Sequence, residues 1–92
     1  MLPYNQDIYS DVRYLKQVRL LRNLTLKDME RLMNVDQSTL SKLENGQLDF
    51  TPIYYSRFET ACKKIRLSNI EIASLRKVIE LKEKYATGGK RK

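Results

Sequence analysis

The sequence predicts an all-α fold, and three observations lead to that prediction. Apolar side chains recur at intervals of three and four residues, which is the spacing of one helix face. Only 3 glycines and 2 prolines interrupt the 92 residues, and no segment alternates between apolar and polar residues as a strand does. Hydrophobic residues make up 41% of the chain, which suffices for one core. We therefore expect one compact domain of five helices over residues 1–92.

The first helix is predicted from about Asp11 to Asn23, after an N-terminal arm of residues 1–10, or from Asp7 if the arm joins the helix. Its apolar side chains repeat at helical spacing and form one face, which consists of Ile8, Val12, Leu15 and Val18. Leu20 lies off this face. Together with the three helices that follow it, this helix is expected to build the main body of the domain over residues 11–67.

A short second helix is predicted over about residues 25–33. Thr25, with Asp28 three residues later, has the pattern of a capping box, in which each side chain accepts a hydrogen bond from the backbone N–H of the other residue. Asn34 is expected to end the helix, because asparagine tolerates the left-handed backbone that a tight exit needs.

The third predicted helix begins almost immediately and covers about residues 36–45. Asp36 is its expected N-cap, because an aspartate at this place accepts hydrogen bonds from the free N–H groups of the first turn. Leu40 and Leu43 form its buried side. The Asn-Gly pair at residues 45–46 supplies the stop.

A loop of residues 47–51 leads to the fourth helix, and we expect Leu48 and Phe50 to face inward from it. Thr51 followed by Pro52 predicts the start of that helix, because proline is well accommodated in the first helical turn. The apolar face of the fourth helix consists of Phe58, Ala61, Cys62 and Ile65.

An extended C-terminal helix is predicted over residues 68–85. Ser68, with Glu71 three residues later, forms a second capping-box pattern and begins it. Residues 86–92 contain two adjacent glycines followed by three consecutive basic residues. We expect them to form a flexible basic tail.

The composition excludes most classes of enzyme. The chain carries 18 Lys and Arg against 11 Asp and Glu, a net charge of +7, and contains no His. Without His and with a single Cys, it cannot form a Ser/His/Asp or Cys/His catalytic arrangement, a zinc site with Cys and His ligands, or an internal disulfide. We therefore expect no enzymatic activity, no cofactor and no metal. A single domain also leaves no room for a ligand-sensing domain, so no small-molecule ligand is expected.

The sequence also indicates no association with a membrane. Its longest apolar runs contain two or three residues, far fewer than a bilayer span requires. The first residues lack the charged and apolar regions of a secretory signal. We expect the protein in a reducing cytoplasm.

Two short helices joined by a tight turn, in a basic helical domain, are the layout of a helix-turn-helix, whose second helix lies in the major groove. The segments that sharpen this interpretation are Val18-Arg19, Thr25 to Met29, and Ser38-Thr-Leu-Ser-Lys-Leu-Glu-Asn-Gly46. In these segments the chain resembles the Xre-like family of phage and bacterial repressors, over about Val12 to Ile72. The resemblance implies a lambda-repressor-like fold and binding to double-stranded DNA.

The resemblance also implies an ion pair. In the family an Arg late in the first helix commonly pairs with the Glu that closes the recognition helix, and Arg19 and Glu44 occupy these places. The alternative is a loose surface pair that contributes little to stability. Glu30 departs from the family pattern, which usually has a small residue there. Either the two helices cross more widely than usual, or the Glu30 side chain turns to solvent.

Rotation by about 100° per residue places four polar residues of the third helix, Ser38, Ser41, Lys42 and Asn45, away from its buried side, and Gln37 lies in the first turn, nearest the groove floor in this docking mode. These candidates for contact with DNA bases are Gln37, Ser38, Ser41, Lys42 and Asn45. Candidates for contact with phosphates lie at the start of the second helix and along the loop that faces the DNA backbone in the family; they are Thr25, Lys27, Gln47, Tyr54, Tyr55 and Arg57. An ordinary solvated surface is the alternative for each of these residues.

The C-terminal helix bears on assembly, because its apolar arc approaches about 200°, against about 100° for an ordinary surface helix. One stripe, Ile72, Leu75 and Ile79, can serve the domain's own core. The second stripe consists of Ile70, Val78, Leu81 and Tyr85. We expect this second stripe to form a homodimer interface. The N-terminal arm folded over the stripe, or a protein partner bound to it, are the alternatives.

The sequence therefore predicts a sequence-specific DNA-binding transcriptional regulator. We expect a repressor that binds a palindromic operator as a homodimer and acts by occlusion. The alternative, from a different class, is a protein-interaction module on a helix-turn-helix fold, such as an antitoxin or a repressor modulator.

Overall fold

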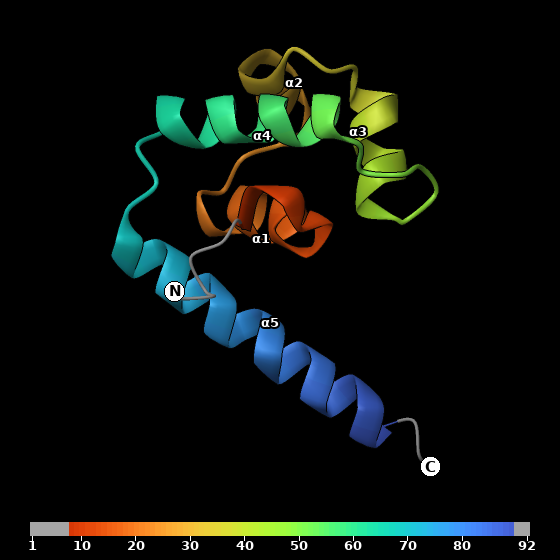
Figure 1. Cartoon of the computed structure of the whole chain (residues 1–92), viewed down its shortest axis with the longest axis vertical. Coiled ribbons are helices and arrows are strands. Elements are labelled where there is room, and N and C mark those ends of the chain that lie inside the picture. Colours follow the sequence, from red (N-terminus) through yellow and green to blue (C-terminus); the bar gives the residue numbers. More distant parts are fainter. Residues whose placement is uncertain (1–7, 90–92) are drawn as a thin grey trace.

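Six helical elements, with no strand among them, make up residues 8–89. A computed structural model describes these residues, with side chains for residues 8–85. In chain order the elements are η2 (Ile8–Ser10), α1 (Val12–Leu21), α2 (Leu26–Met33), α3 (Gln37–Glu44), α4 (Pro52–Lys64) and α5 (Asn69–Gly89) (Figure 1). The all-α fold is confirmed, and the five predicted helices correspond to α1–α5. None of the helices in the described part is both long and apolar enough to cross a membrane.

The short helices begin and end at the residues that the sequence predicted. Thr25 Oγ1 accepts a hydrogen bond from the Asp28 amide at 3.0 Å, and Asp28 Oδ2 accepts one from the Thr25 amide at 2.8 Å. Asp36 accepts a bond from the Ser38 amide at 3.0 Å at the start of α3. Asn34 leaves α2 in the left-handed region, with a φ of 57°. These caps and this exit are confirmed.

The same reciprocal capping begins α5. The Ser68 amide donates to Glu71 Oε1 at 2.8 Å, and the Glu71 amide donates to Ser68 Oγ at 3.1 Å. The helix then continues to Gly89, so the predicted end at Tyr85 was too early. Glycine weakens a helix by about 1 kcal/mol but keeps its backbone N–H. A pair of glycines at the end of a long helix therefore does not by itself terminate it.

Two other boundaries differ from the prediction. The chain turns at Asn23, whose φ is 59°, so α1 ends at Leu21 and not at Asn23. The end of the predicted arm forms the 3-10 helix η2, while residues 1–7 of that arm lie outside the described residues. Residues 90–92 of the predicted basic tail also lie outside them.

The loop before α4 differs from the prediction in the position of Leu48 and in how the helix begins. Phe50 packs against Phe58, with ring centroids 6.2 Å apart, but Leu48 is 40% exposed and does not face inward. The prediction for Leu48 was wrong because Phe50 alone reaches the core from this loop. Thr51 makes no side-chain capping bond, so the start of α4 depends on the fixed φ of Pro52 in its first turn.

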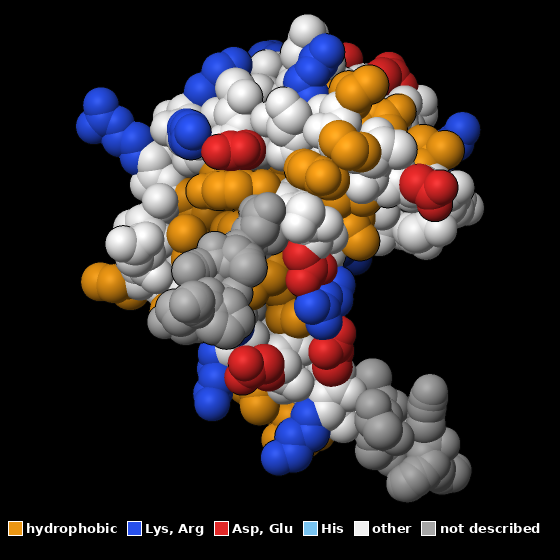
Figure 2. All heavy atoms as spheres, in the orientation of Figure 1, with side chains coloured by type: hydrophobic (Ala, Val, Ile, Leu, Met, Phe, Trp, Pro, Cys, Tyr) orange, Lys and Arg blue, Asp and Glu red, His pale blue; other side chains and the backbone are white. Residues whose placement is uncertain are grey.

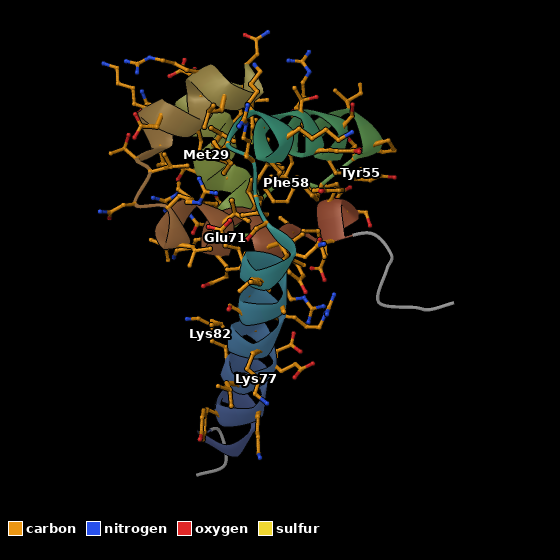
Figure 3. The ribbon with its side chains drawn as sticks, turned by 90° about the vertical axis from the view of Figure 1, so that its left-hand side faces the viewer. Met29, Tyr55, Phe58, Glu71, Lys77 and Lys82 are labelled. Carbon is orange, nitrogen blue, oxygen red and sulfur yellow. The ribbon has the colours of Figure 1, made fainter. Side chains whose placement is uncertain are left out.

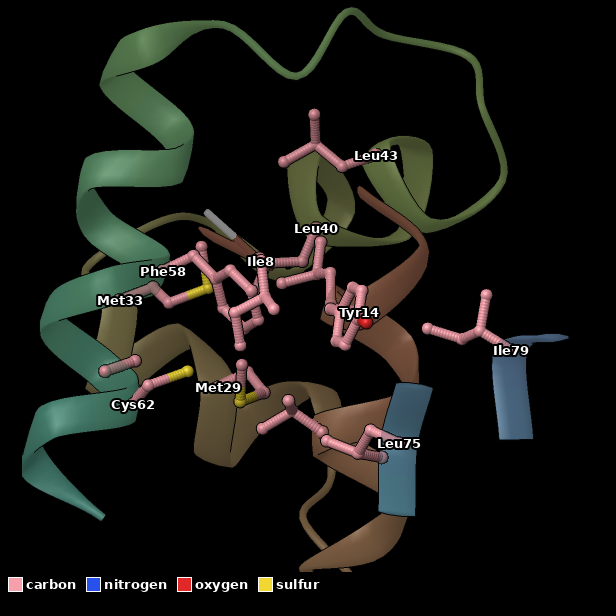
Figure 4. Packing of buried hydrophobic residues seen from close by; sticks show 13 residues of the cluster. Ile8, Tyr14, Met29, Met33, Leu40, Leu43, Phe58, Cys62, Leu75 and Ile79 are labelled. Carbon is pink, nitrogen blue, oxygen red and sulfur yellow. The ribbon is translucent and has the colours of Figure 1, made fainter. Parts of the chain in front are cut away.

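One hydrophobic core unites these elements around Phe58 of α4. The rings of Tyr9 and Phe50 meet the fully buried Phe58 ring edge-on, with centroids 6.1 and 6.2 Å away. Eight further side chains of α1–α4 are at most 1% exposed: Leu15, Val18, Met29, Met33, Leu40, Leu43, Ala61 and Cys62 (Figure 4). Burial raises the pKa of the Cys62 thiol to about 12, so this side chain stays protonated and packs as an apolar group.

α5 attaches to this body through one face and then leaves it. Leu75 and Ile79 are 2% and 6% exposed and belong to the core cluster, on the side of α5 that packs against α1 (Figure 4). Arg13 of α1 forms an ion pair with Glu83 further along α5. Beyond this contact the end of α5 projects away from the other helices (Figure 1).

Candidate nucleic-acid interface

α2 and α3 pack against each other across a turn of residues 34–36, and residues 26–44 are called the α2–α3 unit below. Four of its side chains are at most 1% exposed: Met29, Met33, Leu40 and Leu43. Helices of eight residues are too short to be stable alone in water. Burial of these side chains, together with the neighbouring helices, therefore fixes how α2 and α3 cross.

Two basic side chains of α4 hold the end of α2. Arg57 Nη1 donates to the carbonyl oxygens of Met33 at 3.3 Å and Asn34 at 2.9 Å, and Lys64 Nζ donates to that of Leu32 at 3.4 Å. Carbonyl groups in the last turn of a helix lack partners within the helix and carry partial negative charge. Arg57, predicted as a phosphate contact, is thus engaged in holding the turn between α2 and α3.

Arg19 and Glu44 join α1 to the end of α3. Arg19 Nε lies 2.8 Å from Glu44 Oε2 and Nη2 lies 3.0 Å from Oε1, which makes a two-pronged ion pair. Their side chains are only 15% and 7% exposed. Arg19 Nη1 also donates to the Leu24 carbonyl at 3.2 Å. The hydrogen bonds to Glu44 raise the pKa of Arg19, and the pair is a partly buried tie between two helices.

A second tie between distant segments went unpredicted. Arg22 Nε and Nη2 donate to the two carboxylate oxygens of Glu71 at 2.6 and 2.9 Å, and so join the end of α1 to the first turn of α5. The Arg22 guanidinium and the Ser68 amide lower the pKa of Glu71 to about 2. The sequence marks Glu71 only as half of a capping box, and no local spacing links it to Arg22.

The surface of α3 opposite its buried leucines is polar and accessible. Among the five predicted base contacts, Ser41 is half-buried, and four are exposed: Gln37, Ser38, Lys42 and Asn45. The structure therefore brings these five residues onto one side of α3, away from Leu40 and Leu43. This set is called the exposed face of α3 below.

An acidic cap occupies the beginning of the exposed face. Asp36 accepts hydrogen bonds from the Ser38 hydroxyl and from the amides of Ser38 and Thr39. These bonds, that from the Ser38 hydroxyl foremost, lower the pKa of Asp36. Since the hydroxyl hydrogen of Ser38 is directed to Asp36, Ser38 offers only acceptor lone pairs to any other group.

Glu30 sits at the junction of α2 and α3, where the family usually has a small residue. It is half-buried, and its Oε1 accepts a hydrogen bond from Gln37 Nε2 at 3.1 Å. The Glu30 carboxylate therefore lies against the first residue of α3. Met29 and Leu40 nevertheless remain buried in the core beside this junction.

Two of the residues predicted to contact phosphates, Thr25 and Lys27, lie at the start of α2. The amide and hydroxyl oxygen of Thr25 are both used in the capping box with Asp28, whereas Lys27 is exposed in the same turn. Hydrogen bonds from Thr25 lower the pKa of Asp28, so this turn carries a negative charge as well as the Lys27 cation.

Three further candidates lie in the loop after α3 and near the start of α4. Gln47 is exposed, and its amide donates to the Lys42 carbonyl at 2.8 Å. Tyr54 and Tyr55 are half-buried in α4, with the Tyr55 ring 5.9 Å from that of Phe50 (Figure 3 labels Tyr55 and Phe58). The aromatic contact between Tyr55 and Phe50 packs the loop against the start of α4.

Comparison with known proteins identifies the framework that carries this surface. A helix-turn-helix family model matches residues 15–63, more than half of the chain, from α1 through nearly all of α4. Neither the curated proteins nor the solved structures gave a match. The matched stretch contains the α2–α3 unit and both members of the Arg19–Glu44 pair. The chain belongs to the Xre-like, lambda Cro type of helix-turn-helix family, a family of DNA-binding regulators.

Proposed function

We propose that this protein is a sequence-specific transcriptional regulator that inserts α3 into the major groove of double-stranded DNA. The observation that carries the proposal is the exposed face of α3, held opposite a closed core by the Arg19–Glu44 pair and by Arg57. In this docking mode the first turn of the recognition helix lies nearest the base edges. Gln37 is therefore the principal candidate for base contact, with Ser41, Lys42 and Asn45 following along the helix.

The remaining candidates take supporting parts in the proposal. Lys27 at the start of α2 and Gln47 after α3 are exposed and suit phosphate contact, as do the half-buried Tyr54 and Tyr55 of α4. Three other predicted contacts already donate or accept hydrogen bonds within the protein: Thr25 through its amide and hydroxyl, Ser38 through its hydroxyl hydrogen, and Arg57 through Nη1.

The proposal extends to assembly, because α5 exposes a second apolar stripe. Its members are Ile70 at 80%, Val78 at 37%, Leu81 at 41% and Tyr85 at 69% exposure. In Figure 2, hydrophobic side chains on the projecting part of α5 are visible among charged ones. The exposed stripe supports a homodimer in which two copies of α5 pack about a two-fold axis. Such a dimer presents two α3 helices to a palindromic operator and represses by occluding polymerase in the cytoplasm.

The same stripe favours a second candidate function. A protein-interaction module, such as an antitoxin or a repressor modulator, would use the apolar stripe of α5 to bind a different protein. Phosphate contacts release counterions, so DNA binding weakens steeply with salt. Apolar burial on α5 does not weaken in this way.

Selection of bound fragments from random duplex DNA tests the proposed function. We expect one enriched sequence with two-fold symmetry, and an affinity that falls log-linearly between about 50 and 200 mM salt. Gln37→Ala should weaken binding to that sequence by about 1 to 3 kcal/mol, whereas Lys63→Ala, on α4 away from the exposed face, should leave it unchanged. An absence of enrichment contradicts the DNA-binding proposal, and an enriched sequence without symmetry contradicts the dimer.

A further inference from the structure

Two side chains from different helices meet at the start of the exposed face of α3. Gln37 Nε2 donates to Glu30 Oε1 at 3.1 Å. Glu30 is half-buried in the middle of α2, and Gln37 is exposed in the first turn of α3. The bond therefore ties the residue proposed to lie nearest the bases to the helix behind it.

The chemistry of the two groups decides which end of the amide faces Glu30. A carboxylate only accepts hydrogen bonds, whereas the amide of Gln37 has one donating and one accepting end. Rotation of the amide by 180° would put its carbonyl oxygen against the carboxylate and leave no donor between two acceptors. Glu30 thus selects one orientation, with Nε2 toward α2 and with Oε1 and the second N–H of Gln37 left for another partner.

We infer that Glu30 is a positioning residue that sets the base preference of Gln37, an inference that rests on the proposed function. In the selected orientation Gln37 can present an acceptor and a donor side by side. These match the N6 amino group and the N7 atom of adenine. An amide that rotates freely can instead direct its NH2 group at O6 or N7 of guanine. Removing Glu30 should therefore reduce the discrimination between adenine and guanine at one position.

The frame around the bond is rigid enough for this role. α2 and α3 share the buried contact of Met29, Met33, Leu40 and Leu43. Arg57 binds the carbonyls of Met33 and Asn34 at the turn between them. Because the two helices are fixed, the carboxylate of Glu30 keeps its place relative to Gln37 without support from the DNA.

Competition binding to an operator with each of the four base pairs at the Gln37 position tests the inference. That position is the one whose preference disappears in Gln37→Ala. We expect Glu30→Gln and Glu30→Ala to lower the adenine-to-guanine preference there by roughly threefold to tenfold, the value of about one hydrogen bond. Preferences at other positions should not change. Glu59→Gln, on α4, removes one negative charge elsewhere and should leave the ratio at that position unchanged.

Combining the substitutions separates positioning from direct contact. In a Gln37→Ala background, Glu30→Gln should not change the base ratio further. A changed ratio in that background would mean that Glu30 contacts a base itself and would overturn the inference, as would unchanged ratios in both single variants. If Glu30→Ala does not fold, the nearly isosteric Glu30→Gln decides. A wild-type protein without any base preference contradicts the proposed function, which is a separate result.

Discussion

The α2–α3 unit and α5 differ in helix length and in how much of their apolar surface is buried. The unit consists of two helices of eight residues whose apolar side chains are closed into the core. α5 has 21 residues, and only one of its two apolar stripes is covered. The unit therefore depends on its neighbours to exist, whereas α5 contributes a surface that the rest of the described chain leaves uncovered.

The polar contacts follow the same division. Long-range ties converge on the unit from α1 and α4, through Glu44, Met33 and Asn34. α5 is tied to α1 through Glu71 and Glu83, and Lys77 and Lys82 lie between these two residues along α5 (Figure 3). Precise side-chain placement suits the reading of bases, and an apolar stripe suits association. The substitutions that follow test whether these two regions are as separate as their contacts indicate.

The largest effect is expected from a charge in the second stripe of α5. Val78→Asp would place two carboxylates in the apolar contact of a dimer, and each buried ion costs several kcal/mol as an order of magnitude. The monomer should stay folded, because Val78 is already 37% exposed in it. Sedimentation at micromolar concentration should show a dimer for wild type and a monomer for the variant, with unchanged helix content by circular dichroism. A wild-type monomer would contradict the proposed dimer.

Two leucines allow the regions to be compared with the same substitution. Leu40→Ala, in the unit, removes a side chain with 0% exposure and should cost about 2 to 5 kcal/mol of unfolding free energy. Leu81→Ala, on α5 at 41% exposure, should cost the monomer less than about 1 kcal/mol. Urea denaturation at a concentration below that of dimerisation measures both. Equal losses would show that the second stripe belongs to the monomer core.

Removal of one partner from the Arg19–Glu44 pair is the next test. Glu44→Ala strands a guanidinium that is 15% exposed, and we expect a loss of about 3 kcal/mol. The matched control is Glu59→Ala, which breaks an exposed pair with Lys63 on α4 and should cost at most about 0.5 kcal/mol. Denaturation midpoints within error of each other would reduce the Arg19–Glu44 pair to a surface contact.

The sequence predicted local features of this fold better than distant ones. The capping boxes at Thr25 and Ser68 were predictable because both partners lie within three residues, so spacing alone brings them together. The helical faces were predictable for the same reason. Leu48 was not, because only the packed structure decides which of two loop side chains reaches the core.

Interactions between distant segments account for most of what the sequence left out. Arg22 and Glu71 are 49 residues apart, and nothing in the spacing of charges marks them as partners. Arg57 was predicted as a phosphate contact because its place in the family faces the DNA backbone, yet its partners are carbonyls 23 and 24 residues earlier. The resemblance did point to Arg19 and Glu44, which no periodicity could have joined.

Low pH should weaken the contact between α5 and the end of α1, because it protonates Glu71. Its pKa is lowered from 4.5 to about 2, so the carboxylate stabilises the folded state above its unfolded pKa, and this contribution is lost as the pH falls from about 4.5 toward 2. Asp28 and Asp36, with lowered pKa values, lose their capping contributions in the same direction. Glu71→Gln should therefore show a smaller loss of stability on acidification than wild type, measured by urea midpoints at neutral pH and at low pH. An equal loss would remove Glu71 from the acid response.

The smallest expected effect is a change in the salt dependence of DNA binding, which should differ between a lysine of α3 and a lysine of α5. Lys42→Ala, on the exposed face of α3, should lower the slope of log affinity against log salt by about 0.9 for each phosphate that the lysine neutralises, for every DNA sequence alike. If Lys42 binds a guanine instead, the weakening is confined to one base position. Lys77→Ala is the matched control, because it removes the same charge from α5. An unchanged slope in Lys77→Ala keeps α5 away from the DNA. Equal changes in both variants would show that α5 follows the DNA backbone, and the division between a reading unit and an associating helix would then fail.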